Sequence, residues 1–277
     1  MAGTAVGLGA GWLALDRLAE RIYGQQKPRL ERQLGRIMGH PLRLGAYRGL
    51  SPFAIGFQVG PSRFLAGVDN PSTLQTQGLA LAVDPLRSLW QRALVLELQL
   101  QRPAVQLQAN RRGSYWEFPP QKPPARPPRL GLRIRLADPA RVQLFTAAAR
   151  QPLALRLRGD AELSLWQRQI GWGGQLEPAQ GGHLRFGGRL QWRQRSLELQ
   201  LQPSRLPLEP ALALLPPGLQ QQLGGRLRGT LQGSLALQRR PGANGCRGVL
   251  RLQGWQWRLP GLPQPLAGDP LTLRCSP

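Results

Sequence analysis

The chain alternates between leucine and polar residues over unusually long stretches. Between positions 223 and 237 every odd residue is Leu or Gly, and no even position holds an apolar side chain larger than that of alanine. Successive side chains of a β-strand point to opposite faces, so we predict one long strand with an apolar face and a polar face. At about 3.3 Å per residue it would extend roughly 50 Å, well beyond an ordinary strand.

The same alternation recurs elsewhere and predicts further strands of this kind. They cover residues 94–101, 130–136, 153–157, 184–193, 197–201 and 271–275. The alternation changes phase at Arg102-Pro103 and at Gly254, where we expect a strand end or a bulge. Alternation on one face is typical of antiparallel sheets, because buried parallel strands are apolar on both faces. The sequence therefore predicts a mostly β fold, with an antiparallel sheet that is apolar on one face.

Proline and glycine fall mainly between the alternating segments and indicate turns and connections. Residues 121–129 include four prolines and are predicted to form a linker. A second break is predicted over residues 207–218, with a short helix at 209–215.

The N-terminal segment is predicted to be helical. Residues 1–15 carry no charge, but they are too few to span a bilayer and lack the basic start of a signal peptide. We interpret them as the outer half of a membrane anchor whose beginning is missing; a frayed terminal helix is the alternative. Amphipathic helices are predicted over residues 16–23 and 28–38, with Pro28 in the first turn of the second helix.

The net charge of +23, with an isoelectric point near 11.9, raises the possibility of nucleic-acid binding. Only Lys27 and Lys122 are lysines, and the arginines are spread over the polar faces of the predicted strands without a basic run of five. We therefore expect no nucleic-acid partner, although a basic protein acting on nucleic-acid phosphate stays an open alternative. Arginine suits phosphate of any kind, including that of lipid headgroups, but it also keeps an exposed sheet soluble.

No set of residues typical of an enzyme or a metal protein can be assembled. His40 and His183 fall in predicted turns, and the acidic residues are scattered rather than paired. We therefore expect no catalytic activity, no cofactor and no metal. Cys246 and Cys275 are too few for a disulfide framework; Cys275 continues an apolar face, so we expect a buried free thiol, with one bridge as the alternative in an oxidising compartment.

The order of short motifs along the chain resembles that of a known family. Residues 39–45 read GHPLRLG, residues 83–86 read VDPL and residues 113–116 read GSYW, while residues 225–233 and 248–252 are long alternating runs. This order is similar to the N-terminal region of the translocation and assembly module (TamB) family of the AsmA-like superfamily, and closest to its cyanobacterial branch. In that family a "gly-x-trp" turn is usual, whereas Ser114 and Tyr115 stand between Gly113 and Trp116 here.

The resemblance implies a trough-shaped protein of the bacterial envelope. Members are anchored in the inner membrane by a single N-terminal helix and face the periplasm, in cyanobacteria or other Gram-negative bacteria. Their long antiparallel sheet curls into an apolar-lined trough, which is proposed to conduct phospholipid acyl chains in outer-membrane biogenesis. They also support the assembly of outer-membrane proteins, or protein translocation, together with an Omp85-type partner that binds the C-terminal part of the family.

The resemblance also implies a domain layout. We expect a truncated anchor at 1–20, a helix and β region at 21–120, the linker at 121–129, and a long-strand β-trough at 130–277 that continues beyond this chain. Glycines at 225, 229 and 233 would allow such a sheet to curve.

The residues expected to line a lipid groove belong to the apolar sides of the alternating segments. They are Leu96, Leu98, Leu100, Val105, Leu107, Leu132, Ile134, Leu136, Leu153, Leu155, Leu157, Leu184, Phe186, Leu190, Leu199, Leu201, Leu227, Leu231, Leu235, Leu237, Leu250 and Leu252. Periodicity alone is equally compatible with a closed sandwich in which this face packs on a second sheet. Strand length and the family resemblance favour the open groove. The expected function is phospholipid transport through the trough, with a scaffold for outer-membrane protein assembly as the alternative.

Overall fold

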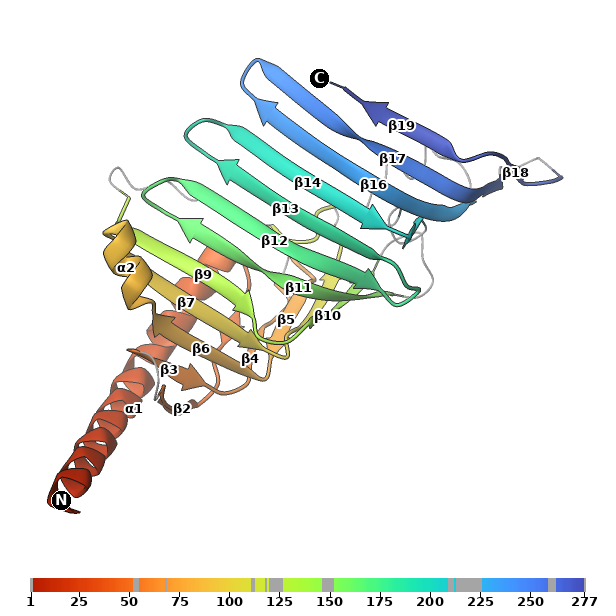
Figure 1. Ribbon diagram of the computed structural model, residues 1–277. Coiled ribbons are helices and arrows are strands. Elements are labelled where there is room, and N and C mark those ends of the chain that lie inside the picture. The colour runs from red at the N-terminus through yellow and green to blue at the C-terminus, as the bar shows by residue number, and fades with distance from the viewer. Residues whose placement is uncertain are drawn as a thin grey trace.

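The computed structural model describes the chain except for residues 1, 52–54, 68, 111–112, 118, 120–126, 146–151, 209–211, 213–225, 259–262 and 277, and the side chains of 2–11 and 226. The described part is mostly β, with one large mixed sheet and two helices that flank it (Figure 1). Its elements are α1 (Ala2–Met38), β1 (Leu42–Arg43), β2 (Tyr47–Leu50), β3 (Ile55–Val59), β4 (Ser62–Phe64), β5 (Thr73–Thr76), β6 (Gly78–Val83), α2 (Pro85–Gln91), β7 (Leu94–Gln101), β8 (Ala104–Gln108), β9 (Leu130–Leu136), β10 (Ala140–Phe145), β11 (Leu153–Ser164), β12 (Gln169–Pro178), β13 (His183–Gln191), β14 (Ser196–Ser204), β15 (Leu206–Pro207), β16 (Arg226–Arg240), β17 (Ala243–Arg258), β18 (Leu266–Ala267) and β19 (Leu271–Cys275). The mostly β prediction with N-terminal helix is confirmed.

Helix α1 is continuous, so the prediction of two separate N-terminal helices is wrong. Pro28 lies inside the helix, where it removes one backbone hydrogen bond. The helix persists because contacts on both sides of Pro28 hold it against the same short segment of the sheet. Before the proline, the carboxylate of Asp16 accepts hydrogen bonds from the Tyr47 hydroxyl at 2.7 Å and the Leu50 amide at 2.9 Å. After it, the carboxylate of Glu31 accepts from a backbone amide of the loop before β2 at 2.7 Å.

No helix in the described residues combines the length and the apolar character needed to cross a membrane.

The N-terminal half of the sheet curls into two layers that share β11. One layer follows the pairings β2–β3–β6–β7–β9–β11, and the other follows β1–β4–β5–β8–β10–β11. The two halves of β11 pair with different strands: Asp160–Ser164 pairs with β9, and Leu153–Leu157 pairs with β10. Figure 1 shows β4, β5 and β10 behind β6, β7 and β11. The core lies between these layers, around Ala140, Val142 and Leu155.

Two pairings in this half are parallel, so the prediction of a wholly antiparallel sheet is wrong in detail. Strands β7 and β9 run parallel, and so do β8 and β10. The reason is that β7–β8 and β9–β10 are two equivalent corners, each passing from one layer to the other. The turn at Pro103 lies beside the turn at Pro139, and the amide of Arg102 donates to the carboxylate of Asp138 at 3.0 Å. Because the chain passes through both corners in the same direction, β7 runs parallel to β9 and β8 runs parallel to β10.

The C-terminal half is a single antiparallel layer of long strands, β11–β12–β13–β14–β16–β17–β19. Strand β16 has 15 described residues, which confirms a single long strand over positions 226–237; positions 223–225 of that prediction lie outside the described residues. Both predicted phase changes are confirmed. Strand β7 ends before Pro103, and a bulge opposite Gly229 includes Gly254, whose φ is +55°. The predicted linker and the helix at 209–215 fall largely outside the described residues.

Candidate functional site

The register of the sheet aligns apolar residues of successive strands into rows that run across the molecule. One row crosses eight strands, from β3 to β14, and therefore extends roughly 35 Å at about 4.8 Å per strand. It consists of Ile55, Val83, Leu96, Leu132, Leu163, Ile170, Leu190 and Leu197. Paired residues share one face, so the row forms a continuous apolar strip.

A second row runs parallel to the first and reaches further along the sheet. It consists of Phe57, Leu81, Leu98, Ile134, Ala161, Trp172, Gly188, Leu199, Leu237 and Cys246. Gly188 belongs in this row because the ring of Trp172 lies directly over it, and a Cβ there would collide with that ring. The row therefore keeps a close-packed surface even where it contains a glycine.

All predicted groove residues are described, and the structure gathers them on this one face. Leu96, Leu132 and Leu190 belong to the first row, and Leu98, Ile134, Leu199 and Leu237 belong to the second. Further pairs on the same face are Leu100–Leu136, Phe186–Leu201, Leu201–Leu235 and Leu231–Leu252; Leu184 pairs with Pro203, Leu250 with Gly233, and Leu227 with Trp257. Val105, Leu107, Leu153, Leu155 and Leu157 lie in or against the core cluster between the two layers.

The two halves of this face differ in how far they are covered. In the curled half, Leu144 is 1 % exposed and Leu155 is 5 % exposed. In the single-layer half, none of the leucines in β13, β14, β16 or β17 is buried, and Leu237 is 36 % exposed. Within the described part of the chain, these four strands pack mainly against neighbouring strands of the same sheet. The structure is therefore a sheet that is not closed, with a continuous apolar face.

The opposite face of the sheet is polar and carries ion pairs between neighbouring strands. Arg133 contacts Asp160 and Arg135 contacts Glu97, each with a nitrogen–oxygen distance of 3.2 Å. Partly exposed pairs of this type add little to stability, but they keep the face hydrated. The two faces of the sheet therefore differ in character: one is apolar and the other carries the charged side chains.

Two of the three glycines that were expected to let the sheet curve lie at positions where the backbone itself favours glycine. Gly229 and Gly233 have φ angles of +144° and +135°, a region that residues with a side chain rarely adopt. A Cβ on Gly233 would also collide with the carbonyl oxygen of Val249 in the paired strand. Gly225 lies outside the described residues.

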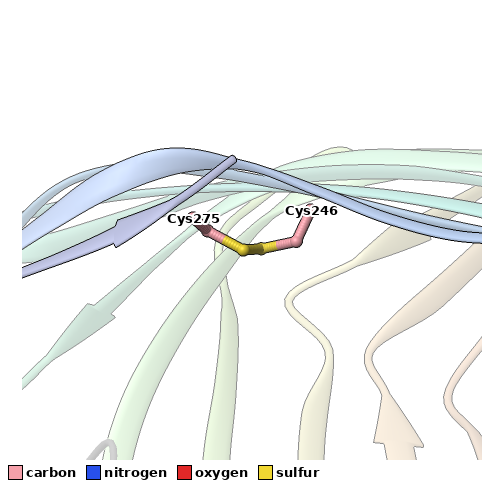
Figure 2. Close-up of a disulfide and its surroundings, with 2 residues drawn as sticks. All are labelled: Cys246 and Cys275. Carbon is pink, nitrogen blue, oxygen red and sulfur yellow. A yellow bond between two sulfur atoms is a disulfide. The ribbon is translucent and has the colours of Figure 1, made fainter. Parts of the chain in front are cut away.

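The cysteines form a disulfide, so the expectation of a buried free thiol is wrong. Cys246 of β17 and Cys275 of β19 are joined with a Cα–Cα distance of 5.5 Å, and Figure 2 shows the bridge between the two strands. In the register, Cys275 pairs with Gly248, two residues from Cys246 on the same face. The alternation placed Cys275 on the apolar face correctly, but only strand pairing brings the two sulfurs together.

Helix α2 was not predicted from the sequence. Asp84 caps it by accepting a hydrogen bond from the amide of Arg87 at 3.0 Å, and Pro85 occupies its first turn. The helix leaves Leu86 80 % exposed and Trp90 91 % exposed. The Asp-Pro pair after a strand was the available signal for a capped helix start.

The loop that follows α1 holds a buried histidine. The ring of His40 is 1 % exposed; its Nδ1–H donates to the carbonyl oxygen of Leu65 at 3.0 Å, and its centroid lies 4.0 Å from that of Trp116. Burial lowers the pKa of His40, although the hydrogen bond to Leu65 opposes that shift. Within α1, burial and the charge of Glu31 raise the pKa of Tyr23 to about 12. The Tyr23 hydroxyl donates to the carbonyl oxygen of Gly45 at 3.0 Å and so holds α1 against the segment before β2.

Comparisons of the chain with protein-family models, with curated proteins and with solved structures find no match.

Proposed function

We propose that this protein is a lipid-transport protein of the bacterial envelope, similar to the TamB family, whose trough carries the acyl chains of phospholipids between membranes. The observation that carries the proposal is the apolar face itself, which continues from strand to strand while its leucines in β13, β14, β16 and β17 stay unburied. A soluble protein seldom leaves such a surface without a ligand or partner.

The energetics of acyl-chain binding fit a surface of this kind. Burial of one methylene group is worth about 0.8 kcal/mol, so a chain of a dozen carbons would gain roughly 10 kcal/mol before the entropy of binding is subtracted. That gain requires no particular polar contact. A ladder of leucines can therefore hold a chain at many equivalent positions, as transport along a trough requires.

The disulfide supports a location outside the cytosol. Structural disulfides form and persist in oxidising compartments such as the periplasm, and are rare among cytosolic proteins. The bridge between Cys246 and Cys275 is therefore consistent with a periplasm-facing protein. Attachment to the inner membrane through the N-terminal helix is part of the same proposal and rests on the family resemblance.

The proposal is tested by lipid retention in matched variants of one strand. The full chain is purified from an envelope fraction, and native mass spectrometry followed by lipid extraction measures co-purified phospholipid. Leu199→Asp with Leu201→Asp places two charges on the apolar face, whereas Gln200→Asp with Gln202→Asp places two on the polar face of the same strand. We expect phospholipid to co-purify with the wild type and with the variant changed at Gln200 and Gln202, but not with the variant changed at Leu199 and Leu201. A folded, lipid-free wild type, or equal retention by both variants, would contradict the proposal.

A second candidate function is a scaffold for outer-membrane protein assembly, together with an Omp85-type partner. It is favoured by β19, which among the described strands pairs only with β17 and leaves Leu273 67 % exposed. An edge strand of this kind can pair with a strand of a client protein. Site-specific crosslinking from Thr272 to a β-barrel client would support this function. If no crosslink forms while the protein binds lipid, only the transport function would remain supported.

A further inference from the structure

A cluster of arginines lies at the rim of the trough where the apolar face ends. In the register, Arg239 of β16 pairs with Leu197, so it occupies the next position of the first apolar row. Together with Leu190, Trp192 and Arg195 it lines a cavity of about 610 Å³ at the turns that join β13 to β14 and β16 to β17. This cavity therefore combines an apolar floor with a basic border.

The charge of this cavity is nearly uncompensated. Arg240 reaches the carboxylate of Glu198 at 3.8 Å, and both side chains are about half exposed, so the pair is weak. Among the described residues, neither Arg195 nor Arg239 has an acidic partner. Planar guanidinium groups bind the oxygens of a phosphate through paired, charge-assisted hydrogen bonds. An indole ring such as that of Trp192 suits the border between apolar chain and polar headgroup.

The β13–β14 turn holds Arg195 in an unusual backbone conformation. Arg195 has a φ of +50°, in the left-handed region where Gly or Asn is ordinarily preferred. All five described non-glycine residues with positive φ are arginines, although arginine makes up only about an eighth of the chain. Because Arg168 of the β11–β12 turn shares this conformation, the assignment of Arg195 rests on its place in the cavity beside the apolar row.

We propose that Trp192, Arg195 and Arg239 form a headgroup site that binds the phosphate of a phospholipid while its acyl chain lies on Leu190 and Leu197. The inference rests on the proposed lipid-binding function and adds to it the class of lipid and its orientation. The headgroup lies at the rim, in contact with water, and the chain lies inside the trough. Neutral lipids lack the phosphate, so only their acyl chain contributes to the binding free energy.

A second cavity at the same end of these strands supplies a matched control. It is lined by Arg168 of the β11–β12 turn and Arg193 of the β13–β14 turn, together with Trp166, Gln169 and Gln191. Arg168 has a φ of +52°, close to that of Arg195. Arg168→Gln with Arg193→Gln therefore removes two rim charges on the polar side. Arg195→Gln with Arg239→Gln removes two charges beside the apolar floor. Net charge changes equally in the two variants.

The experiment is calorimetric titration of the chain of 277 residues with three probes: lysophosphatidic acid, the monoacylglycerol with the same acyl chain, and inorganic phosphate. We expect the wild type and the control variant to bind the phosphate-bearing lipid at least about tenfold more tightly than the monoacylglycerol. In the Arg195/Arg239 variant this ratio should fall to about one, with monoacylglycerol binding unchanged.

The other outcomes separate the headgroup site from the proposed function. Equal binding of both lipids by the wild type would overturn the headgroup site and leave the apolar groove intact. Binding of neither lipid would overturn both. Inorganic phosphate bound as tightly as the lipid would show a simple anion site and would also overturn the inference.

A glycine variant tests whether Arg195 serves the fold instead. Arg195→Gly removes the side chain and suits the left-handed backbone. We expect its urea unfolding midpoint to rise or stay unchanged while the preference for the phosphate-bearing lipid falls. A lower midpoint with an unchanged preference would assign Arg195 a structural role and would overturn its place in the site.

Discussion

Leucines on the apolar face should contribute very differently to stability in the two halves of the sheet. Leu144 lies between the two layers and is 1 % exposed, whereas Leu237 lies in the single-layer half and is 36 % exposed. Both belong to regular strands, and both can be replaced by alanine without introducing charge. The pair Leu144→Ala and Leu237→Ala therefore compares a covered with an uncovered position of the same face.

The expected magnitudes follow from the burial of each side chain. Replacement of a fully buried leucine by alanine removes three carbon atoms, worth about 2.4 kcal/mol in transfer free energy, and the cavity left at Leu144 raises the loss to about 3–4 kcal/mol. At Leu237 no closed cavity is created and part of the side chain is already in water. The loss there should be at most about 1.5 kcal/mol.

Urea unfolding of the lipid-free protein, followed by circular dichroism, measures both free-energy changes. Lysophosphatidic acid at a hundred times its dissociation constant should then add about 2.7 kcal/mol to the wild type. A loss at Leu237 as large as that at Leu144 would refute the reasoning, because it would mean that the apolar face of the single-layer half is covered as a sandwich core is covered.

Three further predictions concern the backbone, pH and the disulfide. Gly233→Ala should lower the free energy of unfolding by about 2–3 kcal/mol, because its Cβ would collide with a paired strand at positive φ, whereas Gly245→Ala, with no atom nearer than 3.8 Å, should be near neutral; urea unfolding tests both. The pKa of His40 is lowered by folding, so below about pH 6.5 the unfolded chain binds a proton that the folded chain does not. The free energy of unfolding should therefore fall from pH 6.5 down to the folded-state pKa. His40→Gln should remove this fall, which unfolding curves at about pH 7.5 and about pH 5.5 measure. The disulfide joins residues 29 apart in the sequence and should stabilise the folded state by about 3.5 kcal/mol in the loop-entropy model. Cys246→Ser with Cys275→Ser should therefore increase hydrogen exchange of the β19 amides. Unchanged exchange in β19 would contradict this prediction.

The strands were the most predictable part of the molecule. The segment at 130–136 was predicted to the residue as β9, because a period of two over seven residues leaves no alternative secondary structure. The same period places Leu199 and Leu237 on the apolar side of their own strands, and the register then brings them onto one face. The α1 helix was predicted as two pieces, because a proline signals a break unless contacts on both sides hold the axis, and such contacts are not visible in a sequence.

The sequence by itself determined that the chain forms long strands with one leucine face, since alternation is a local property that each strand expresses alone. Only the tertiary structure decided which strands become neighbours. The parallel corners at Pro103 and Pro139, the bridge between Cys246 and Cys275, and the position of Arg239 at the end of an apolar row all depend on that decision. The physical reason is that register joins residues far apart in the chain, through loops whose composition does not specify the pairing.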